Sequence, residues 1–229
     1  MHLTPRLEAI AKQVTHRAIV ADIGTDHAYI PIYLVENNIS KNIYACDINK
    51  GPLDMAKKQI GKYGYQEDII TLLGEGLDPI KELPTQNIII AGMGGILIKD
   101  IIDKNKEVAL SAEKLILQPM IAQEDLREYL IKNGFTIIHE ELAREDRRIY
   151  QIIVAQKGKS EAWDEIHYHI SKNLIQDRHP LLENLIDAKE NELRKIVRAC
   201  DDQRSEHAIQ RSMECKTLLE KLMEVKKCL

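Results

Sequence analysis

The chain has 229 residues, a formal net charge of −4 and four cysteines, so it has room for one α/β domain with a smaller appendage. The slightly acidic balance excludes a global basic field, and any nucleic-acid partner must be held by local clusters of Lys and Arg. The scattered cysteines include no Cys-x-x-Cys pair, and there is neither an apolar run of about 18 residues nor a signal-peptide pattern, so we expect a cytoplasmic protein with reduced thiols and no membrane contact.

Short apolar runs alternate with helix-like segments as far as about residue 157, as in an open parallel sheet. The predicted strands are Ala18–Ile23, Asn42–Cys46, Ile69–Leu73, Asn87–Ala91, Lys114–Leu117, Phe135–Leu142 and Tyr150–Gln156. The predicted helices are Arg6–Val14, Ala28–Glu36, Pro52–Lys62, Ile96–Asp103 and Ala122–Asn133. The short polar joint Ala143–Ile149 predicts an antiparallel hairpin at the sheet edge. The expected fold is therefore α/β, with a Rossmann-like, seven-stranded, mostly parallel, doubly wound sheet.

The remainder of the chain differs in character, because it has no glycine after Gly158 and is rich in Glu, Lys, Leu and Arg. Apolar residues recur there at a spacing of three to four, which predicts two amphipathic helices that pack as an antiparallel coiled coil. Their core positions are Leu182, Ile186, Lys189, Leu193, Ile196 and Cys200, then Ile209, Met213, Leu218 or Leu219, Leu222 and Val225, with a turn at Asp201–Glu206. We expect a catalytic domain over residues 1–158 and a helical domain over residues 159–229.

The turn after the first predicted strand, within Asp22–Pro31, is the most informative part of the chain. Gly24 allows the backbone to turn and a ligand to approach, and the helix that follows points its free N–H groups at the same place. A dinucleotide site would have Gly-x-Gly-x-x-Gly here, and the carboxylate of Asp26 would repel a pyrophosphate. Asp26 therefore favours a ligand with a cationic or hydroxyl-bearing part, although a helix N-cap is an alternative role.

Acidic residues also follow the second and third predicted strands. Asp47 lies 25 residues after Asp22, near the spacing at which an acidic residue binds the ribose of a nucleoside. Glu75 stands between Gly74 and Gly76, where a carboxylate can meet an exocyclic amine such as that of adenine. Each has a structural alternative, an N-cap for Asp47 and a plain turn for Glu75. Together with the first turn, they favour a nucleoside-bearing cofactor.

The fourth predicted strand ends in Ala91–Gly95, which has three glycines in four positions, and the fifth ends in Leu117–Met120. So many glycines indicate a close approach of the backbone to another group. A P-loop is excluded because no Gly-Lys-Ser/Thr follows. The ends of all five strands should meet at one crevice. A metal site is not expected, because His27 has no partner at ligand spacing.

These motifs closely resemble one known family. The segments Asp22–Pro31, Gly74–Leu77, Ile90–Gly95 and Leu117–Pro119 are similar to those of the bacterial tRNA (adenine(22)-N(1))-methyltransferases. The resemblance spans roughly residues 3–157 and continues more loosely into the tail. It implies a class I methyltransferase that uses S-adenosylmethionine and has a C-terminal coiled coil. Two departures are visible: the first turn lacks the Gly-x-Gly-x-Gly of the broad class, and Glu75 stands where Asp is usual.

The resemblance also implies roles for single residues. Gly24, Asp26 and His27 would line the methionine end of the cofactor, and Asp22 would complete the cofactor site. Asp47 would hold the ribose, and Glu75 and Gly76 would line the adenine side. Gly92, Met93 and Gly94 would line the sulfonium region and the target base.

Methylation at N1 of adenine sets modest chemical demands. This nitrogen has an in-plane lone pair, so no enzymic nucleophile is required and positioning is the main contribution, with the base extruded from the folded RNA. Asp26 is the candidate to stabilise the cationic product or accept its proton, unless it serves only the cofactor amino group. Tyr29 is the candidate to stack on or hydrogen-bond the base, unless it is a helix core residue. Gln118 and Pro119 are expected to contact the substrate.

Three local clusters of basic residues are candidates for binding tRNA phosphates. They are Lys57, Lys58 and Lys62; Arg144, Arg147 and Arg148; and Arg194, Lys195 and Arg198. A solvated surface balanced by nearby carboxylates is the alternative for each. A small-molecule methyltransferase on the same fold would not need the helical tail, and a non-catalytic adaptor would not need the residues at every strand end. We therefore expect a monomeric tRNA adenine-N1 methyltransferase.

Overall fold

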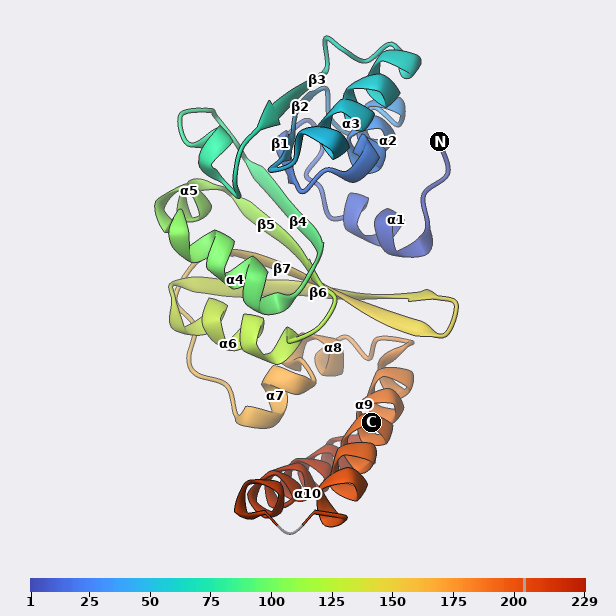
Figure 1. The fold of residues 1–229 in the computed structure, drawn as a ribbon, viewed down its shortest axis with the longest axis vertical. Coiled ribbons are helices and arrows are strands. Elements are labelled where there is room, and N and C mark those ends of the chain that lie inside the picture. Colours follow the sequence, from blue (N-terminus) through green and yellow to red (C-terminus); the bar gives the residue numbers. More distant parts are fainter. Residues whose placement is uncertain (204) are drawn as a thin grey trace. The chain divides into compact units, whose positions relative to one another are not determined.

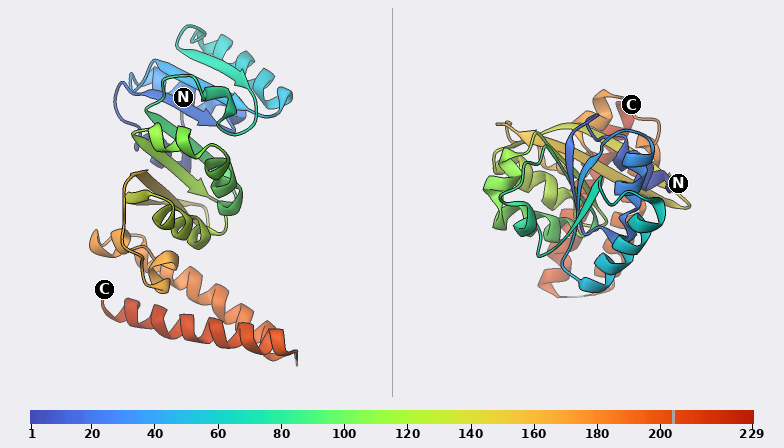
Figure 2. Two further views of the ribbon diagram at one scale, coloured as in Figure 1. Left: turned by 90° about the vertical axis from the view of Figure 1, so that its left-hand side faces the viewer. Right: turned by 90° about the horizontal axis from the view of Figure 1, so that it is seen from above.

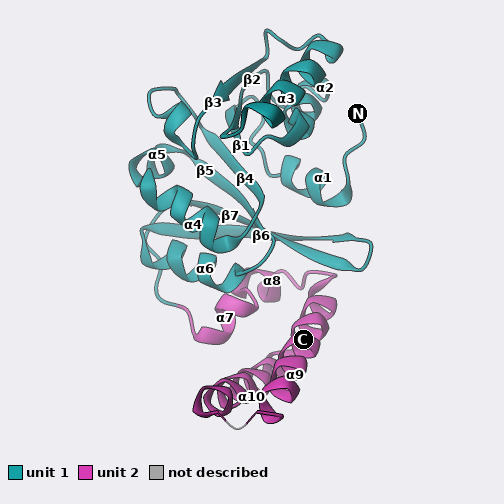
Figure 3. Cartoon of the chain, viewed as in Figure 1, with its two compact units in different colours: residues 1–162 teal, residues 163–229 magenta. Residues whose placement is uncertain are grey.

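The computed structural model describes residues 1–203 and 205–229, which form two compact units, Met1–Ala162 and Trp163–Leu229 (Figure 3). The division lies four residues beyond the boundary expected from the sequence, because the segment after the last strand still belongs to the first unit. Ser160 Oγ, for example, donates a hydrogen bond to Thr136 Oγ1 at 3.0 Å.

The first unit is built on a seven-stranded sheet of order β3-β2-β1-β4-β5-β7-β6 (Figure 1). The strands are β1 Ile19–Ile23, β2 Asn42–Asp47, β3 Ile69–Leu73, β4 Asn87–Met93, β5 Lys114–Pro119, β6 Phe135–Glu145 and β7 Arg148–Lys157. The first five pair in parallel, and β7 is antiparallel to both β5 and β6. The predicted α/β fold is thereby confirmed. The strands are added outward in one direction from β1 to β3 and in the other direction from β4 onward, so the topological switch point lies between β1 and β4, which is where open α/β sheets bind ligands.

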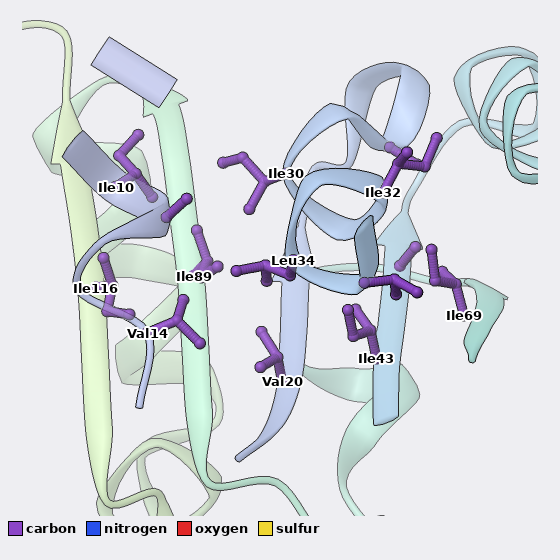
Figure 4. Close-up of a cluster of buried hydrophobic side chains, with 14 of the residues drawn as sticks. Ile10, Val14, Val20, Ile30, Ile32, Leu34, Ile43, Ile69, Ile89 and Ile116 are labelled. Carbon is purple, nitrogen blue, oxygen red and sulfur yellow. The ribbon is translucent and has the colours of Figure 1, made fainter. Parts of the chain in front are cut away.

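Helices cover both faces of this sheet (Figure 2). They are α1 Pro5–Ala11, α2 Tyr29–Glu36, α3 Lys50–Tyr63, α4 Gly95–Lys104, α5 Lys106–Ser111 and α6 Gln123–Lys132, with short 3₁₀ turns η1 Asp26–Ala28 and η2 Asp78–Ile80. On one face, α1 to α3 pack apolar side chains against the central strands. Ile10, Ile32 and Leu34 lie there with Val20, Ile43 and Ile89, all essentially inaccessible (Figure 4).

The hairpin β6–β7 is longer than the sequence suggested. Residues of the expected joint Ala143–Ile149 are paired, with Glu145 opposite Arg148, so the turn consists of Asp146 and Arg147 alone. Asp146 has a φ of 54°, which an Asp tolerates better than most residues in a two-residue turn. The polar composition of this segment marks an exposed hairpin rather than a loop.

The second unit contains α7 Glu165–His169, α8 Lys172–Gln176, α9 Leu182–Asp201 and α10 Glu206–Lys227. Two ion pairs show that α9 and α10 are antiparallel, because Lys226 near the end of α10 pairs with Asp187 near the start of α9, whereas Lys216 pairs with Asp201. Coiled-coil packing of this pair stays a prediction. Residue 204, within the predicted turn Asp201–Glu206, lies outside the described residues.

The buried face of α10 includes the predicted Leu218 and Leu222 but differs from the prediction in the first half of the helix. Ile209 and Met213 are 52% and 64% exposed, whereas the small side chains of Ala208 and Ser212 are buried in their place. Ser212 Oγ donates a hydrogen bond to Asp201 Oδ1 at 2.6 Å, so a polar contact fixes the rotation of the helix at this end. A pattern based on apolar residues alone could not predict this contact.

No described helix is long and apolar enough to cross a membrane.

A fully buried ion pair fastens α6 to the hairpin. The Arg127 guanidinium donates hydrogen bonds to Glu140 Oε1 at 2.8 Å and to Gln151 Oε1 at 2.6 Å. Neither Arg127 nor Glu140 is more than 1% exposed, and burial raises the pKa of Glu140 despite the opposing charge of Arg127.

We predict that Arg127→Met destabilises the first unit by about 3–5 kcal/mol, because Glu140 is then left buried without its counter-charge. Urea unfolding of the variant measures this loss. The double variant with Glu140→Leu should recover much of it, since both charges are then removed together. Equal stability of the single variant and the native protein would contradict the structural role of the pair.

Candidate active site

A cavity of about 740 Å³ opens at the C-terminal ends of β1 to β4. Its walls carry residues from the turns after all four strands and from α1 and α4. They include Asp22, Gly24, Asp26, Tyr29, Asp47, Glu75, Gly76, Gly92 and Met93, which the sequence singled out. Such a volume suits a ligand of nucleoside size with a substituent. His27 and Gly94 do not line it, although both are adjacent in sequence to residues that do.

The turn after β1 adopts an unusual backbone conformation. Gly24 has a φ of +76°, which is strained for any residue with a side chain, and a Cβ on it would lie 2.4 Å from Met93 Cε, so the end of the Met93 side chain would have to move. His27 and Ala28 follow with φ values of 57° and 54°, two consecutive non-glycine residues in the left-handed region. Each such residue carries a cost of about 1 kcal/mol or more, which is typical of sites where side-chain placement matters.

This backbone presents Asp26 and Tyr29 at the mouth of the cavity. The Asp26 side chain is 76% exposed, with Oδ1 3.3 Å from His27 Nε2. The Tyr29 ring stacks on the His27 ring with centroids 5.4 Å apart. Asp26 is not the N-cap of α2, since Ala28 occupies that position and no side chain caps it. Tyr29 is 39% exposed and is therefore not a core residue. The two structural alternatives for these residues are thus excluded.

Asp22 and Asp47 form the acidic floor of the cavity. Both are buried, and burial raises the pKa of Asp22 to about 6, with the nearby charge of Asp47 acting in the same direction. Asp47 Oδ1 accepts a hydrogen bond from the Asn49 backbone N–H at 2.7 Å, whereas the N-cap of α3 is Asn49 itself. Asp47 therefore stabilises the loop before α3 and is not its cap. Its second oxygen accepts no hydrogen bond from the described residues, and Asp47 lines the cavity, so this oxygen is available to a ligand.

Cys46, which precedes Asp47 in the sequence, also lines the cavity, but its thiol is not reactive at neutral pH. Burial, together with the charges of Asp22 and Asp47, raises its pKa to about 12. A thiol that stays protonated at neutral pH is not a nucleophile.

The turns after β3 and β4 complete the cavity. Glu75 Oε2 lies 2.7 Å from Lys104 Nζ, so its charge is already balanced by a cation of α4. Gly92 has a φ of +76° and lies at a register shift between β4 and β5. Gly95 serves the fold, because a Cβ on it would lie 2.1 Å from the carbonyl oxygen of Ala122. At Gly95, the close approach expected from the glycine run is therefore made by the backbone of Ala122 and not by a ligand.

Gln118 and Pro119 do not line the cavity. Gln118 is inaccessible, and its Oε1 accepts hydrogen bonds from Arg6 Nη1 at 2.8 Å and from the Gly92 backbone N–H at 3.2 Å, while Nε2 donates to the Pro119 carbonyl at 2.9 Å. Gln118 therefore lies behind the Gly92 turn and fixes its position. The predicted contact of these two residues with a substrate remains a prediction.

Comparison with known proteins now decides the family. A family described as "Methyltransferase domain" matches residues 3–153. A tRNA (adenine(22)-N(1))-methyltransferase of Bacillus subtilis is 39% identical over 162 residues, which are 71% of this chain and 68% of that protein. The chain belongs to the tRNA (adenine(22)-N(1))-methyltransferase family.

Solved structures of the family share the whole fold. The crystal structure of the B. subtilis m1A22 tRNA methyltransferase TrmK is 30% identical, with a TM-score of 0.88 and 98% of each chain covered. The structure of M. capricolum TrmK in complex with S-adenosyl-homocysteine is 28% identical, with a TM-score of 0.84, and the match covers 98% of this chain and 97% of that one.

The three predicted basic clusters lie on different elements and differ in their ion pairs. Lys57, Lys58 and Lys62 are exposed on α3, which packs beside η1 at the site, and Arg144, Arg147 and Arg148 are exposed on the β6–β7 hairpin. None of these six forms an ion pair within residues 1–203 and 205–229. In the second unit, Lys195 and Arg198 are exposed on α9, but Arg194 pairs with Glu190 at 2.8 Å.

Several residues of the cavity were missed from the sequence. They are Thr4, Arg6 and Leu7 of the first turn of α1 and its approach, Ile48 and Asn49 after β2, and Leu97 and Ile101 of α4. None belongs to a glycine or carboxylate motif. Helix α1 lies far in sequence from the strand ends, and only the topology places Arg6 beside them.

We predict that Asp22→Asn stabilises the cofactor-free protein at pH 7–8 by about 3 kcal/mol. The folded protein holds this proton up to about pH 6, whereas the unfolded chain releases it near 3.8. The native protein therefore loses stability as the pH rises through this window, and the Asn variant does not. Thermal unfolding of both proteins between pH 4 and pH 8 measures the difference. Parallel stability curves would contradict a buried, ionisable Asp22.

Proposed function

We propose that this protein transfers a methyl group from S-adenosylmethionine to N1 of an adenine in tRNA, at position 22 as in its relatives. The observation that carries the proposal is the cavity at the β1–β4 strand ends, with four carboxylates in its wall, in a chain of this family. We further propose that it acts as a monomer, since the residues of one chain build the whole cavity. We also propose that it acts in the cytoplasm.

The residues present fit the proposed cofactor. Its amino group suits Asp22 and Asp26, its ribose hydroxyls suit Asp47, and its adenine amine suits Glu75. A pyrophosphate would be repelled by the same carboxylates, which speaks against a dinucleotide. Gly24 leaves open the space that a side chain would fill, next to Met93. When bound, S-adenosylmethionine supplies an electrophilic methyl group attached to a sulfonium.

The chain itself then has to place the acceptor base and manage its charge. No nucleophile of the protein is required, in keeping with a Cys46 thiol that is protonated at neutral pH. Tyr29, supported by its stack on His27, offers an aromatic face to an extruded adenine. Asp26 offers a solvated carboxylate to the positive charge that develops on the base. Holding the base in line is worth several kcal/mol of the barrier.

The RNA is held by surface cations in this proposal. The exposed Arg and Lys side chains of α3 and of the β6–β7 hairpin form no ion pair with the part of the chain that the structure describes, which favours phosphate contacts over a balanced surface. Lys195 and Arg198 on α9 extend the same role to the second unit.

The activity is tested with an unmodified tRNA transcript, labelled S-adenosylmethionine and nucleoside mass spectrometry. We expect 1-methyladenosine in the product and no incorporation into a matched transcript with guanine at position 22. Methylation of both transcripts would contradict position 22, and the absence of 1-methyladenosine would contradict the proposed reaction.

We predict that Asp26→Ala lowers the methylation rate by about 10²–10³-fold, because the cationic product loses its carboxylate. Asp26→Asn, which keeps shape and hydrogen bonding, should be nearly as slow. The single-turnover rate with labelled cofactor is the measurement, and a calorimetric Kd for the cofactor controls for binding. A near-native rate for both variants would remove Asp26 from the reaction.

We predict that Arg147→Gln together with Arg148→Gln weakens tRNA binding and lowers the slope of log K against log salt by about two, or about one for each phosphate that is no longer bound. Cofactor affinity should not change. Arg17→Gln, at an exposed arginine outside these clusters, is the matched control. An unchanged salt slope in the double variant would assign the hairpin to the solvated surface.

A further inference from the structure

Arg6 differs in charge from every other ionised side chain of the cavity. Within the described residues, it is the only Lys or Arg that lines the wall, whereas Asp22, Asp26, Asp47 and Glu75 are all acidic. The four carboxylates match the cationic, hydroxyl and amine groups of the proposed cofactor. They cannot bind its one anionic group, the α-carboxylate of its amino-acid end.

The charge of Arg6 is not neutralised by the protein. Its Nη1 donates to the amide oxygen of Gln118 at 2.8 Å, and its guanidinium carbon lies 5.4 Å from the centre of the Tyr150 ring. Both partners are neutral, and no carboxylate of the described residues pairs with it. A half-buried guanidinium held by neutral partners keeps its full charge for a ligand, at a desolvation cost that an anion would offset.

Arg6 also stands at the appropriate end of the cavity. Gln118 Oε1 accepts from both Arg6 and the Gly92 backbone N–H, and a Cβ built on Gly92 would lie 3.8 Å from Arg6 Nη1. The Gly92 turn is joined to the Gly24 turn through the side chain of Met93. The guanidinium therefore lies beside the Gly92 turn, and Met93 connects this turn to Gly24, which lies in sequence between Asp22 and Asp26, the two residues proposed for the amino group of the cofactor.

We propose that Arg6 binds the α-carboxylate of S-adenosylmethionine and so fixes the amino-acid end of the cofactor. This inference rests on the cofactor of the proposed function. The planar fork of a guanidinium can donate two parallel hydrogen bonds to a carboxylate, and the bond from Nη1 to Gln118 holds the fork in place. A phosphate of the RNA has the same anionic oxygens, so the test separates the two sources.

The test compares two ligands by calorimetry, without any methyl transfer. One is S-adenosylmethionine, and the other is its decarboxylated analogue, which keeps the sulfonium, the amine and the nucleoside. Each is titrated into the native protein, Arg6→Met, Arg6→Lys and the control Arg17→Met, whose native side chain is an exposed arginine away from the cavity. The tRNA affinity of each variant is measured separately.

We expect the native protein and Arg17→Met to bind S-adenosylmethionine about 10- to 100-fold more tightly than the analogue. Arg6→Met should lose that preference by weakening only the carboxylated ligand, and Arg6→Lys should keep part of it. Arg6→Lys decides the question if Arg6→Met does not fold.

Equal weakening of both ligands would reduce Arg6 to a support for Gln118 and overturn the proposal. Weaker tRNA binding with an unchanged preference for S-adenosylmethionine over the analogue would show that Arg6 binds an RNA phosphate instead. That result would overturn the proposal as well. The binding assay involves no RNA modification, so the failure of tRNA methylation would leave this result standing by itself.

Discussion

The close approach of Gly24 to the Met93 side chain brings together the two turns on which the site depends. One turn follows β1 and the other follows β4, the two parallel strands between which the order of the strands reverses. Glycine permits this contact in two ways: the φ of +76° at position 24 is strained for other residues, and a Cβ there would lie 2.4 Å from Met93 Cε and displace that side chain. The left-handed residues His27 and Ala28 then direct Asp26 and Tyr29 toward the mouth of the cavity.

The charge distribution inside this frame selects the ligand. Buried Asp22 and Asp47 at the floor favour cationic and hydroxyl groups, and Glu75, balanced by Lys104, is suited to an amine rather than to a strong cation. Arg6 adds one positive charge to this acidic wall. A zwitterionic amino acid joined to a nucleoside matches this order of charges, and a dinucleotide does not. The family relationship and the electrostatics of the cavity therefore support the same cofactor class by independent routes.

The local patterns of the sequence predicted most of the fold and the acidic half of the site. Apolar runs such as Ile88–Ile90 are buried on both faces, so their periodicity specifies central strands. Asp22, Asp47 and Glu75 lie at or just after the C-terminal ends of β1, β2 and β3, so parallel topology brings them together. The place of Arg6 in the cavity and the role of Gln118 could not be predicted from the sequence, because the contact between them joins residues 112 positions apart and leaves no sequence motif. The exposed Ile209 and Met213 show the same limit, since a polar contact of Ser212 decides the rotation of α10.

Binding of a cationic cofactor by buried carboxylates at the strand ends is tested most directly by one measurement. It is the calorimetric Kd for S-adenosylmethionine between pH 5 and pH 7.5, in the native protein and in Asp22→Asn. Because the pKa of Asp22 in the free protein is about 6, we predict that native affinity falls as the pH drops below 6 and that the Asn variant binds weakly at every pH. An affinity that does not depend on pH in the native protein, or native affinity in Asp22→Asn, would contradict this role of the carboxylates.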